Sequence, residues 1–277
     1  MLTPRRETPI DALELIDDWP ARAAVAVVGA GGVVASRGPI DEEFALASVT
    51  KILSAMMTMF VVQERLLLLD EPIASNGATV RHLLSHAGGL SKERGGRVRD
   101  PEERRIYSNW GFEILGSRVE DETNEPFADS LAHEILAPLG VTSTRLEGSP
   151  AHAAVGTVSD LAEIARELLE PRLLATETIT DMTTVQFGDL DGVLPGYGRQ
   201  TPNPWGLGLE IRGTKAPHWT GANNSPQTFG HFGQAGGFLW VDPEVRIACV
   251  NLSDTAFGAW AIEAWPPLAD AILDQHG

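Results

Sequence analysis

Apolar residues follow two different patterns along the chain, one in its middle and one near its ends. From residue 44 to residue 63 they form a nearly continuous run rich in Leu, Met and Ala, with Lys51 as the only charged residue. Such a run is typical of a buried helix, which we expect to begin near Ser48 and to continue to about residue 69. Near both ends, shorter apolar runs bounded by Gly, Pro or Asp are typical of strands.

These patterns predict strands at both ends of the chain and helices between them. We expect strands at 23–28, 33–36, 206–212, 238–241 and 246–252, and helices at 8–19, 48–69, 79–90, 107–119, 126–137, 159–170 and 258–274. Ser159 is the expected cap of the helix at 159–170. Residues 91–105 are expected to be a charged, exposed loop, and the Gly-, Pro- and Asn-rich residues 186–228 to form long loops around a pocket.

Ser48 and Lys51 give the apolar helix its candidate chemistry. Standing three positions apart, they share one face of a helix. Burial lowers the pKa of a lysine, and a neutral amine beside a serine hydroxyl is a base in contact with a nucleophile. The alternative is structural: Ser48 caps a core helix, and Lys51 extends its ammonium group to the surface. The pair alone does not decide between these two interpretations.

The composition excludes several classes of partner. The chain has 277 residues, a formal net charge of −17 and only three lysines, whereas nucleic acids and anionic membranes are bound by basic patches. We therefore expect a small-molecule substrate, no nucleic acid and no membrane. The single cysteine, Cys249, cannot form an internal disulfide, and acidic residues stand where an apolar signal segment would be. A cytoplasmic location is the expectation, and the oligomeric state stays open.

Three patterns of glycine or histidine could suggest a cofactor or metal site, and we interpret none of them in that way. The segment Gly29-Ala30-Gly31-Gly32 is followed by β-branched residues and a turn where a dinucleotide site needs a helix, so we expect a hairpin. The glycine-dense residues 229–237 lack the spacing and ending of a phosphate-binding loop. His82 and His86 stand four apart, but no third ligand lies nearby, which favours structural roles and predicts no metal.

Three motifs in a fixed order resemble those of a known superfamily. Ser48-Val49-Thr50-Lys51, Tyr107-Ser108-Asn109 and His231-Phe232-Gly233 are similar to the three active-site motifs of serine β-lactamases and penicillin-binding proteins. The likeness is greatest to the class C β-lactamase-like branch, which includes esterases and D-amino-acid peptidases. It extends over roughly residues 20 to 275, and the segment 80–90 resembles that branch's Leu-Leu-x-His-x-Ser-Gly sequence.

The resemblance implies an α/β fold of α+β type, with an antiparallel sheet flanked by helices and a mainly helical part. Residues 1–47 and 200–277 would build the sheet part, and residues 48–199 the helical part, with the site in the cleft between them. Because the two halves of the sheet are far apart in sequence, residues 1–277 are expected to form a single catalytic unit.

Roles follow from the resemblance, position by position. Ser48 would be the nucleophile, with Lys51 and Tyr107 as the proton-transferring groups; which of the two is the general base stays open. Asn109 and His231 would orient the substrate. Gly233 and Gln234 follow His231, and the oxyanion would lie between the backbone N–H groups of Ser48 and Gln234.

Departures from the family pattern bear on the substrate. His231 stands where penicillin-binding proteins carry a lysine, and Phe232 replaces the hydroxyl residue that helps to hold a substrate carboxylate. We therefore expect an esterase-like serine hydrolase that forms an acyl-enzyme on a small ester or amide. A D-amino-acid peptidase or β-lactamase is the first alternative, favoured if Arg199 or Arg212 supplies the missing charge. The second is a catalytically inactive binding protein with the same fold.

Overall fold

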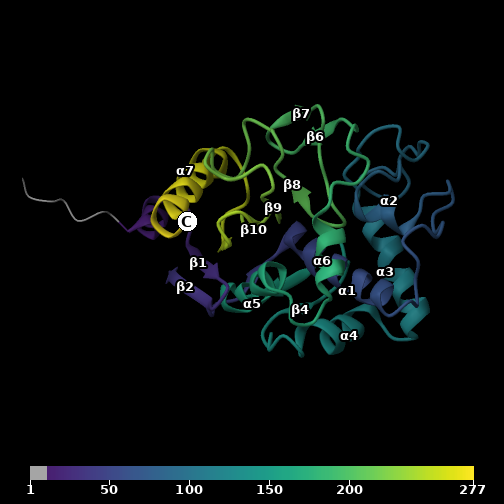
Figure 1. Ribbon diagram of the computed structural model, residues 1–277, viewed down its shortest axis with the longest axis horizontal. Helices are drawn as coiled ribbons and strands as arrows, with labels where there is room; N and C mark the ends of the chain where they lie inside the picture. The colour runs from purple at the N-terminus through teal and green to yellow at the C-terminus, as the bar shows by residue number, and fades with distance from the viewer. Residues whose placement is uncertain (1–10) are drawn as a thin grey trace, which may run out of the picture.

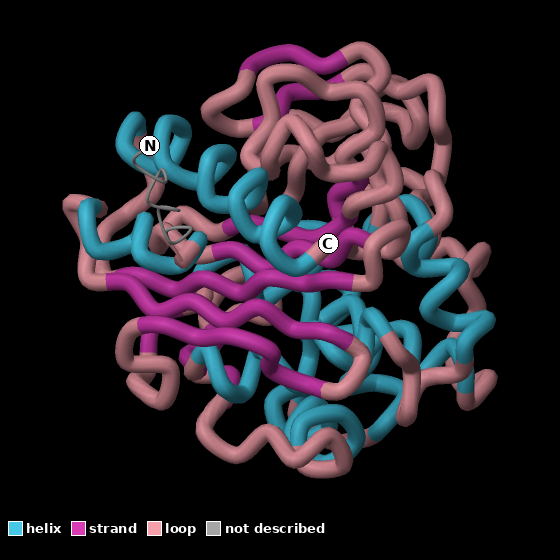
Figure 2. The backbone as a smooth tube through the Cα atoms, turned by 60° about the vertical axis from the view of Figure 1, so that its left-hand side comes forward, coloured by secondary structure: helices cyan, strands magenta, loops and turns pink. Residues whose placement is uncertain are grey.

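The centre of the structure, a computed structural model that describes residues 11–277, is a six-stranded antiparallel sheet (Figures 1 and 2). Its strands lie in the order β2-β1-β11-β10-β9-β8. They are β1 (Ala23–Gly29), β2 (Gly32–Arg37), β8 (Glu210–Ile211), β9 (Phe229–Phe232), β10 (Phe238–Asp242) and β11 (Ile247–Ser253). Because β1 pairs with β11, with Ala23 opposite Ser253, the sheet joins the beginning of the described chain to its end.

The sheet separates two hydrophobic cores. All seven residues of β1 are buried, and its side chains alternate between the two faces as the pleat requires. Ala24, Ala26 and Val28 face the larger core, whereas Val25 and Val27 face the smaller one. This double burial explains why β1 is a continuous apolar run rather than an alternating one.

Helices cover both faces of the sheet (Figure 2). The 3-10 helix η1 (Ala12–Asp18) and α7 (Ala259–His276) pack together beside the smaller core, and α5 (Val158–Leu169) packs against β1, β10 and β11 from the other side. The remaining helical elements are η2 (Ala47–Val49), α1 (Thr50–Gln63), α2 (Val80–Leu84), α3 (Asn109–Thr123), α4 (Phe127–Leu131), the π-helix η3 (Ala132–Leu136) and α6 (Thr176–Thr183). Two small sheets complete the fold, β3 (Phe44–Ala45) with β5 (Ala154–Gly156) and β4 (Arg145–Leu146), and β6 (Gly192–Leu194) with β7 (Gly198–Gln200).

The predicted antiparallel sheet with flanking helices is confirmed. The strands predicted at 23–28, 33–36, 238–241 and 246–252 are present, and residues 29–32 form the expected hairpin. The strand expected at 206–212 is reduced to Glu210–Ile211. Of the opening helix expected at 8–19, positions 8–10 lie outside the described residues, and Ala12–Asp18 form a 3-10 helix.

The prediction that the apolar helix continues to residue 69 is wrong. The helix α1 ends at Gln63, because Arg65 takes the left-handed conformation with φ of 61° and the Leu66 N–H donates back to the Val61 carbonyl. In the segment that follows, Leu67 is buried while Leu66 and Leu68 are exposed. A run of leucines carries no signal that distinguishes a helix from such a turn.

Two further differences concern α5 and α6. The cap of α5 is Thr157, whose hydroxyl accepts a hydrogen bond from the Asp160 N–H, whereas Ser159 donates its hydroxyl hydrogen to Asp41. The prediction of Ser159 as the cap is therefore wrong. The helix α6 was not predicted, because it is only eight residues long and threonine, which occupies four of its positions, is a weak helix former.

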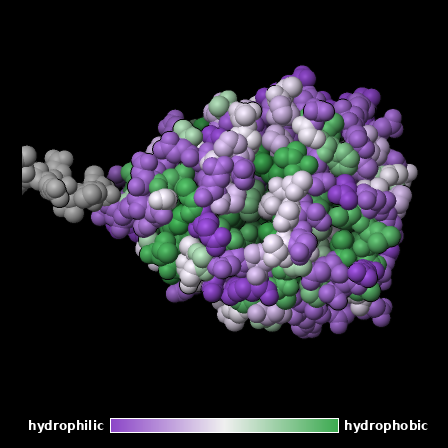
Figure 3. Space-filling view, viewed as in Figure 1, coloured by the Kyte–Doolittle hydropathy of each residue, from purple (hydrophilic) through white to green (hydrophobic). Residues whose placement is uncertain are grey.

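Hydrophilic residues cover most of the face seen in Figure 3, with apolar residues in separate patches. Within residues 11–277, none of the helices combines the length and hydropathy needed to cross a membrane.

Candidate active site

Ser48 lies in the 3-10 turn η2, directly before α1, and lines a cavity of about 650 Å³. The residue before it, Ala47, has a φ of 44°, an uncommon left-handed conformation for a residue other than glycine. No side-chain cap is formed at the start of η2 or of α1. The structural interpretation of Ser48 as a helix cap is therefore wrong, and its hydroxyl is left facing the cavity.

Lys51 lies beneath the cavity, fully buried, so it does not extend to the surface. Its Nζ is 2.8 Å from Asn109 Oδ1, 2.7 Å from the Ala151 carbonyl oxygen and 3.5 Å from Ser48 Oγ. Burial holds the pKa of Lys51 well below its usual range; the charge of Glu93 opposes this shift and that of Lys92 adds to it. No ion pair joins Lys51 to a carboxylate in residues 11–277.

This hydrogen-bond set fits a neutral amine. An uncharged Lys side chain has two N–H donors and one lone pair, and the two close oxygens of Asn109 and Ala151 accept the two hydrogens. Ser48 Oγ is the third polar neighbour, and because burial lowers the pKa of Lys51, the neutral amine can turn its lone pair toward that hydroxyl. A base with its lone pair toward a hydroxyl can take the hydroxyl proton as the oxygen attacks a carbonyl carbon.

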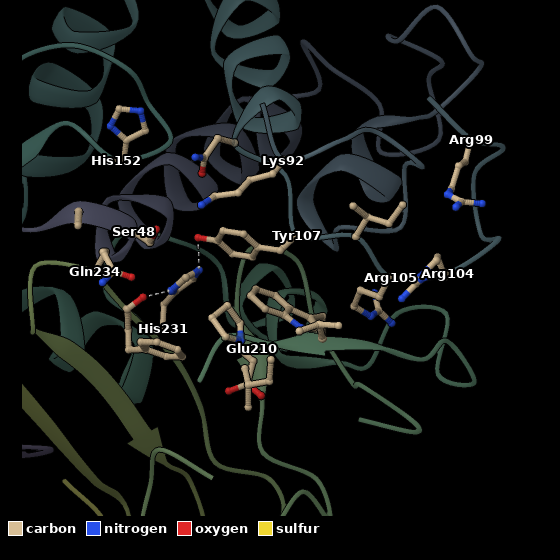
Figure 4. Close-up of a pocket in the computed structure, with 18 residues that line it drawn as sticks. Ser48, Lys92, Arg99, Arg104, Arg105, Tyr107, His152, Glu210, His231 and Gln234 are labelled. Carbon is tan, nitrogen blue, oxygen red and sulfur yellow. Dashed lines mark hydrogen bonds between the residues drawn. The ribbon is translucent and has the colours of Figure 1, made fainter. Parts of the chain in front are cut away.

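Tyr107 and His231 bring two more polar groups to the same place (Figure 4). Tyr107 precedes Ser108, the N-cap of α3, and its hydroxyl lies 3.5 Å from His231 Nε2. Burial raises the pKa of the phenol, against a smaller opposing effect of its hydrogen bond with Ser48. The side chain therefore stays a neutral proton donor.

His231 is held neutral in one tautomer. Its Nδ1 is 2.7 Å from the Phe232 carbonyl oxygen, which accepts a hydrogen bond, so Nδ1 carries the proton and Nε2 is an acceptor. Burial, aided by the nearby charge of Lys51, lowers the pKa of His231 to about 3. His231 is therefore uncharged at neutral pH.

Gly233 brings the loop after β9 against the nucleophile. An added Cβ at Gly233 would lie 2.5 Å from the Leu46 carbonyl oxygen and 3.2 Å from the backbone nitrogen of Ser48. The N–H of Gln234, the next residue, makes no hydrogen bond within residues 11–277. Ser48 lies in the first turn of a helix, where N–H groups lack an intrahelical acceptor. Two backbone donors beside Ser48 Oγ are what an oxyanion needs.

The structure brings all seven residues singled out from the sequence to one place. Ser48, Tyr107, Asn109, His231 and Gln234 line the cavity, and Lys51 and Gly233 lie directly behind Ser48. The amide of Asn109 joins this group to the loop at 91–105, because its Nδ2 donates to Glu93 and its Oδ1 accepts from Lys51.

Other cavity residues were missed by sequence analysis. Residues 92–98 are exposed, as expected of this charged loop. Four cations of the loop nevertheless line the cavity, Lys92, Arg99, Arg104 and Arg105, and Arg105 is buried. The expected sources of charge, Arg199 and Arg212, do not line it. Only the density of arginine in 91–105 distinguishes that segment in the sequence, and charge density alone does not separate a cavity wall from a solvated loop.

Glu210 was also missed. It lines the cavity from β8, but its carboxylate is buried and accepts hydrogen bonds from Lys215, His218 and Trp219. Burial raises the pKa of Glu210, but the charges and hydrogen bonds of His218 and Lys215 outweigh this effect and lower the pKa to about 2. A charge so fully matched holds the loop 203–219 in place and is not free for a substrate.

Several solved structures are similar to this chain. The chain is 48% identical to a beta-lactamase from Mycobacterium bovis, with a TM-score of 0.94 over 96% of this chain and 99% of that one. Simvastatin synthase from Aspergillus terreus (17% identity, TM-score 0.76, 95% and 93% covered) and a hydrolase with promiscuous acyltransferase activity (18%, 0.74, 94% and 96%) share the fold. No curated protein matches the chain. The beta-lactamase family model matches residues 20–272, and the chain therefore belongs to this family of serine hydrolases.

Proposed function

We propose that the protein hydrolyses small esters through an acyl-enzyme on Ser48. The observation that carries the proposal is the pairing of Lys51 with Ser48. A buried amine, donating both of its hydrogens to protein oxygens, keeps its lone pair for the serine hydroxyl at 3.5 Å.

Lys51 is the general base in this mechanism. Ser48 Oγ forms a bond to the substrate carbonyl carbon, and its proton passes to Lys51 Nζ. The negative charge that develops on the carbonyl oxygen is stabilised by the N–H groups of Ser48 and Gln234. Because the pKa of Tyr107 is raised, its phenol serves as a donor to the leaving oxygen rather than as a base, and the Lys51 proton restores it. Water then repeats the sequence on the acyl-enzyme.

We propose an ester rather than a β-lactam as the substrate because two residues of β9, His231 and Phe232, offer no partner for a substrate carboxylate. The position that carries a lysine in penicillin-binding proteins holds neutral His231, and the ring of Phe232 packs against Phe257 at 4.9 Å between centroids. A substrate carboxylate placed there would lose hydration without gaining a partner, which costs several kcal/mol. The 48% identity to a beta-lactamase makes β-lactam hydrolysis the second candidate, and a D-amino-acid peptidase is the third.

Active-site labelling tests the proposed nucleophile. A fluorophosphonate probe followed by mass spectrometry should place one adduct on Ser48, and Ser48→Ala should abolish both the adduct and hydrolysis of p-nitrophenyl butyrate. Loss of a nucleophile lowers kcat by about 10⁴ or more. Unchanged far-UV circular dichroism would show that the variant is folded. Activity within a few-fold of the parent would refute the assignment.

We also propose that residues 1–47, 48–199 and 200–277 act as a single catalytic unit. The support is that Ser48 and Tyr107 come from the middle of the chain and His231 from the sheet. Urea unfolding followed by circular dichroism and by tryptophan fluorescence should then give coincident transitions; separated midpoints would contradict the proposal.

For its location we propose the cytoplasm. The support is the one cysteine, Cys249, which is buried in β11 and cannot form an internal disulfide. Fractionation of the natural host with an antibody to the protein tests this, and recovery outside the cytoplasmic fraction would contradict it.

A further inference from the structure

The wall of the cavity has a charge opposite to that of the protein as a whole. Four cationic side chains line it, Lys92, Arg99, Arg104 and Arg105, against a single acidic one, Glu210, in a chain whose net charge is −17. A cavity lined by one sign of charge attracts ligands of the other sign. All four cations come from residues 92–105, so the charge is concentrated on one wall.

Two of these four cations are already used by the protein. Arg105 donates to three carbonyl oxygens, those of Ser85, Gln186 and Phe187, and Arg99 forms an ion pair with Glu103. Such contacts hold the segment in shape and leave little capacity for a ligand.

Lys92 and Arg104 have no acidic partner among residues 11–277, and the Nε of Arg104 is buried without any hydrogen bond. The acidic side of the cavity does not compensate for them, because Glu210 is matched by Lys215 and His218. A buried donor without a partner is costly, and a ligand oxygen would remove that cost.

The backbone is anchored at Lys92 and at Arg105, the residue that follows Arg104. The Lys92 carbonyl oxygen accepts hydrogen bonds from the N–H groups of Asn109 and Trp110 at the start of α3, and the Arg105 N–H donates to the Asp191 carbonyl. Figure 4 shows the end of the Lys92 side chain pointing toward Ser48 and Tyr107, and Arg104 further along the cavity. Lys92 also lies across Tyr107 from His231, so this cationic wall is distinct from the β9 edge.

We propose that the substrate carries a carboxylate that binds to this cationic wall, with Lys92 and Arg104 as its partners. The proposal rests on the proposed hydrolase function and narrows its substrates to anionic esters. A carboxylate close to the scissile bond would bind Lys92, and one several atoms away would bind Arg104. Charge-assisted hydrogen bonds of this kind are about twice as strong as neutral ones.

The test uses matched esters that differ in one charge. Mono-p-nitrophenyl esters of succinic, glutaric and adipic acid are compared with the p-nitrophenyl esters of neutral acyl chains of equal length. We expect kcat/KM to be at least tenfold higher for the anionic ester at one or more lengths. The double variant Lys92→Met/Arg104→Met should lose that preference at least tenfold, and the single variants identify the cation that each length uses.

Arg97→Met is the matched control, because Arg97 is an exposed arginine of the same segment that does not line the cavity. It removes one positive charge, as each single variant does, and should leave the anionic preference intact. The inference is overturned if the neutral ester is preferred at every length, or if the double variant keeps the preference of the parent.

A failure of the proposed hydrolase function can be distinguished from a failure of the carboxylate site. It would appear as no hydrolysis of any ester and no fluorophosphonate adduct on Ser48. The carboxylate site would then be tested by calorimetric binding of glutarate: binding weakened at least fivefold in the double variant supports it, and no binding to the parent overturns it.

Discussion

Gly233→Ala is the sharpest test of how the oxyanion site is built. The added methyl group would lie 2.5 Å from the Leu46 carbonyl oxygen, a backbone atom, and 3.2 Å from the Ser48 nitrogen. Neither atom is the end of a flexible side chain, so the loop after β9 and the turn η2 must move apart. These two segments carry the two proposed oxyanion donors, Ser48 and Gln234.

Two magnitudes follow from this geometry. Inserting a methylene-sized group into a packed site costs roughly 1–3 kcal/mol of stability. Removing one oxyanion donor costs about 10²–10³ in kcat. Because the methyl group presses on the backbone of the two segments and not on Ser48 Oγ or the Lys51 side chain, we expect kcat to fall by about 10² while fluorophosphonate still labels Ser48 slowly.

The assay compares Gly233→Ala with Gly31→Ala. Gly31 lies in the β1–β2 hairpin with no atom within 4 Å of an added Cβ, so the same substitution should change neither activity nor stability there. Steady-state kinetics with p-nitrophenyl butyrate and urea unfolding give the two quantities. A Gly233→Ala protein with kcat within threefold of the parent would show that the close approach does not set the oxyanion geometry, and the reasoning would fail.

Three other outcomes are expected. Lys51→Met and Tyr107→Phe should each lower kcat strongly, and the double variant should be little worse than the poorer single one, because groups that act as one unit are not additive; multiplicative losses in steady-state kinetics would contradict this. The folded-state pKa of His231 is about 3, against an ordinary 6.5, so the unfolded chain binds its proton first as pH falls. The free energy of unfolding should therefore drop by about 2.5 kcal/mol between pH 7 and pH 4.5 from this group. Urea unfolding of His231→Gln should show a smaller drop, and an equal drop would contradict the assignment. A chromogenic cephalosporin and a D-Ala-D-Ala peptide should each be turned over at least 10²-fold less efficiently in kcat/KM than p-nitrophenyl butyrate, and equal efficiency for the cephalosporin would identify a β-lactamase.

Sequence patterns predicted the fold where burial alone decides the structure. The continuous apolar runs of β1 and β11 are recognisable because both faces of these strands are covered. The pattern failed at Arg65, where one left-handed residue turns an apolar run that otherwise fits a helix. It failed again at α6, whose contacts with α1 and not its threonines decide that it is helical.

The seven candidate site residues were singled out from the sequence because their motifs have fixed local spacing. The cationic wall was not predicted, because the sequence around Arg104, which lines the cavity, does not differ in kind from that around Arg97, which is exposed. That distinction depends on Arg105, whose guanidinium binds carbonyl oxygens of residues 85, 186 and 187. These contacts join parts of the chain far apart in sequence, so they became visible only in the folded structure.

The buried bases around Tyr107 give the proposed proton path a direction. Burial lowers the pKa of Lys51, His86 and His231, and the charge of Lys51 further lowers the pKa of both histidines. A proton taken from Ser48 by Lys51 is therefore buried where neither neighbouring imidazole takes it over. Because burial raises the pKa of Tyr107, the phenol gives up its own proton only as the Lys51 proton replaces it. The departing oxygen of the substrate is the one strong base that the reaction itself creates there. The same desolvation that makes Lys51 a base at neutral pH thus drives the proton onward, through Tyr107, to the leaving group.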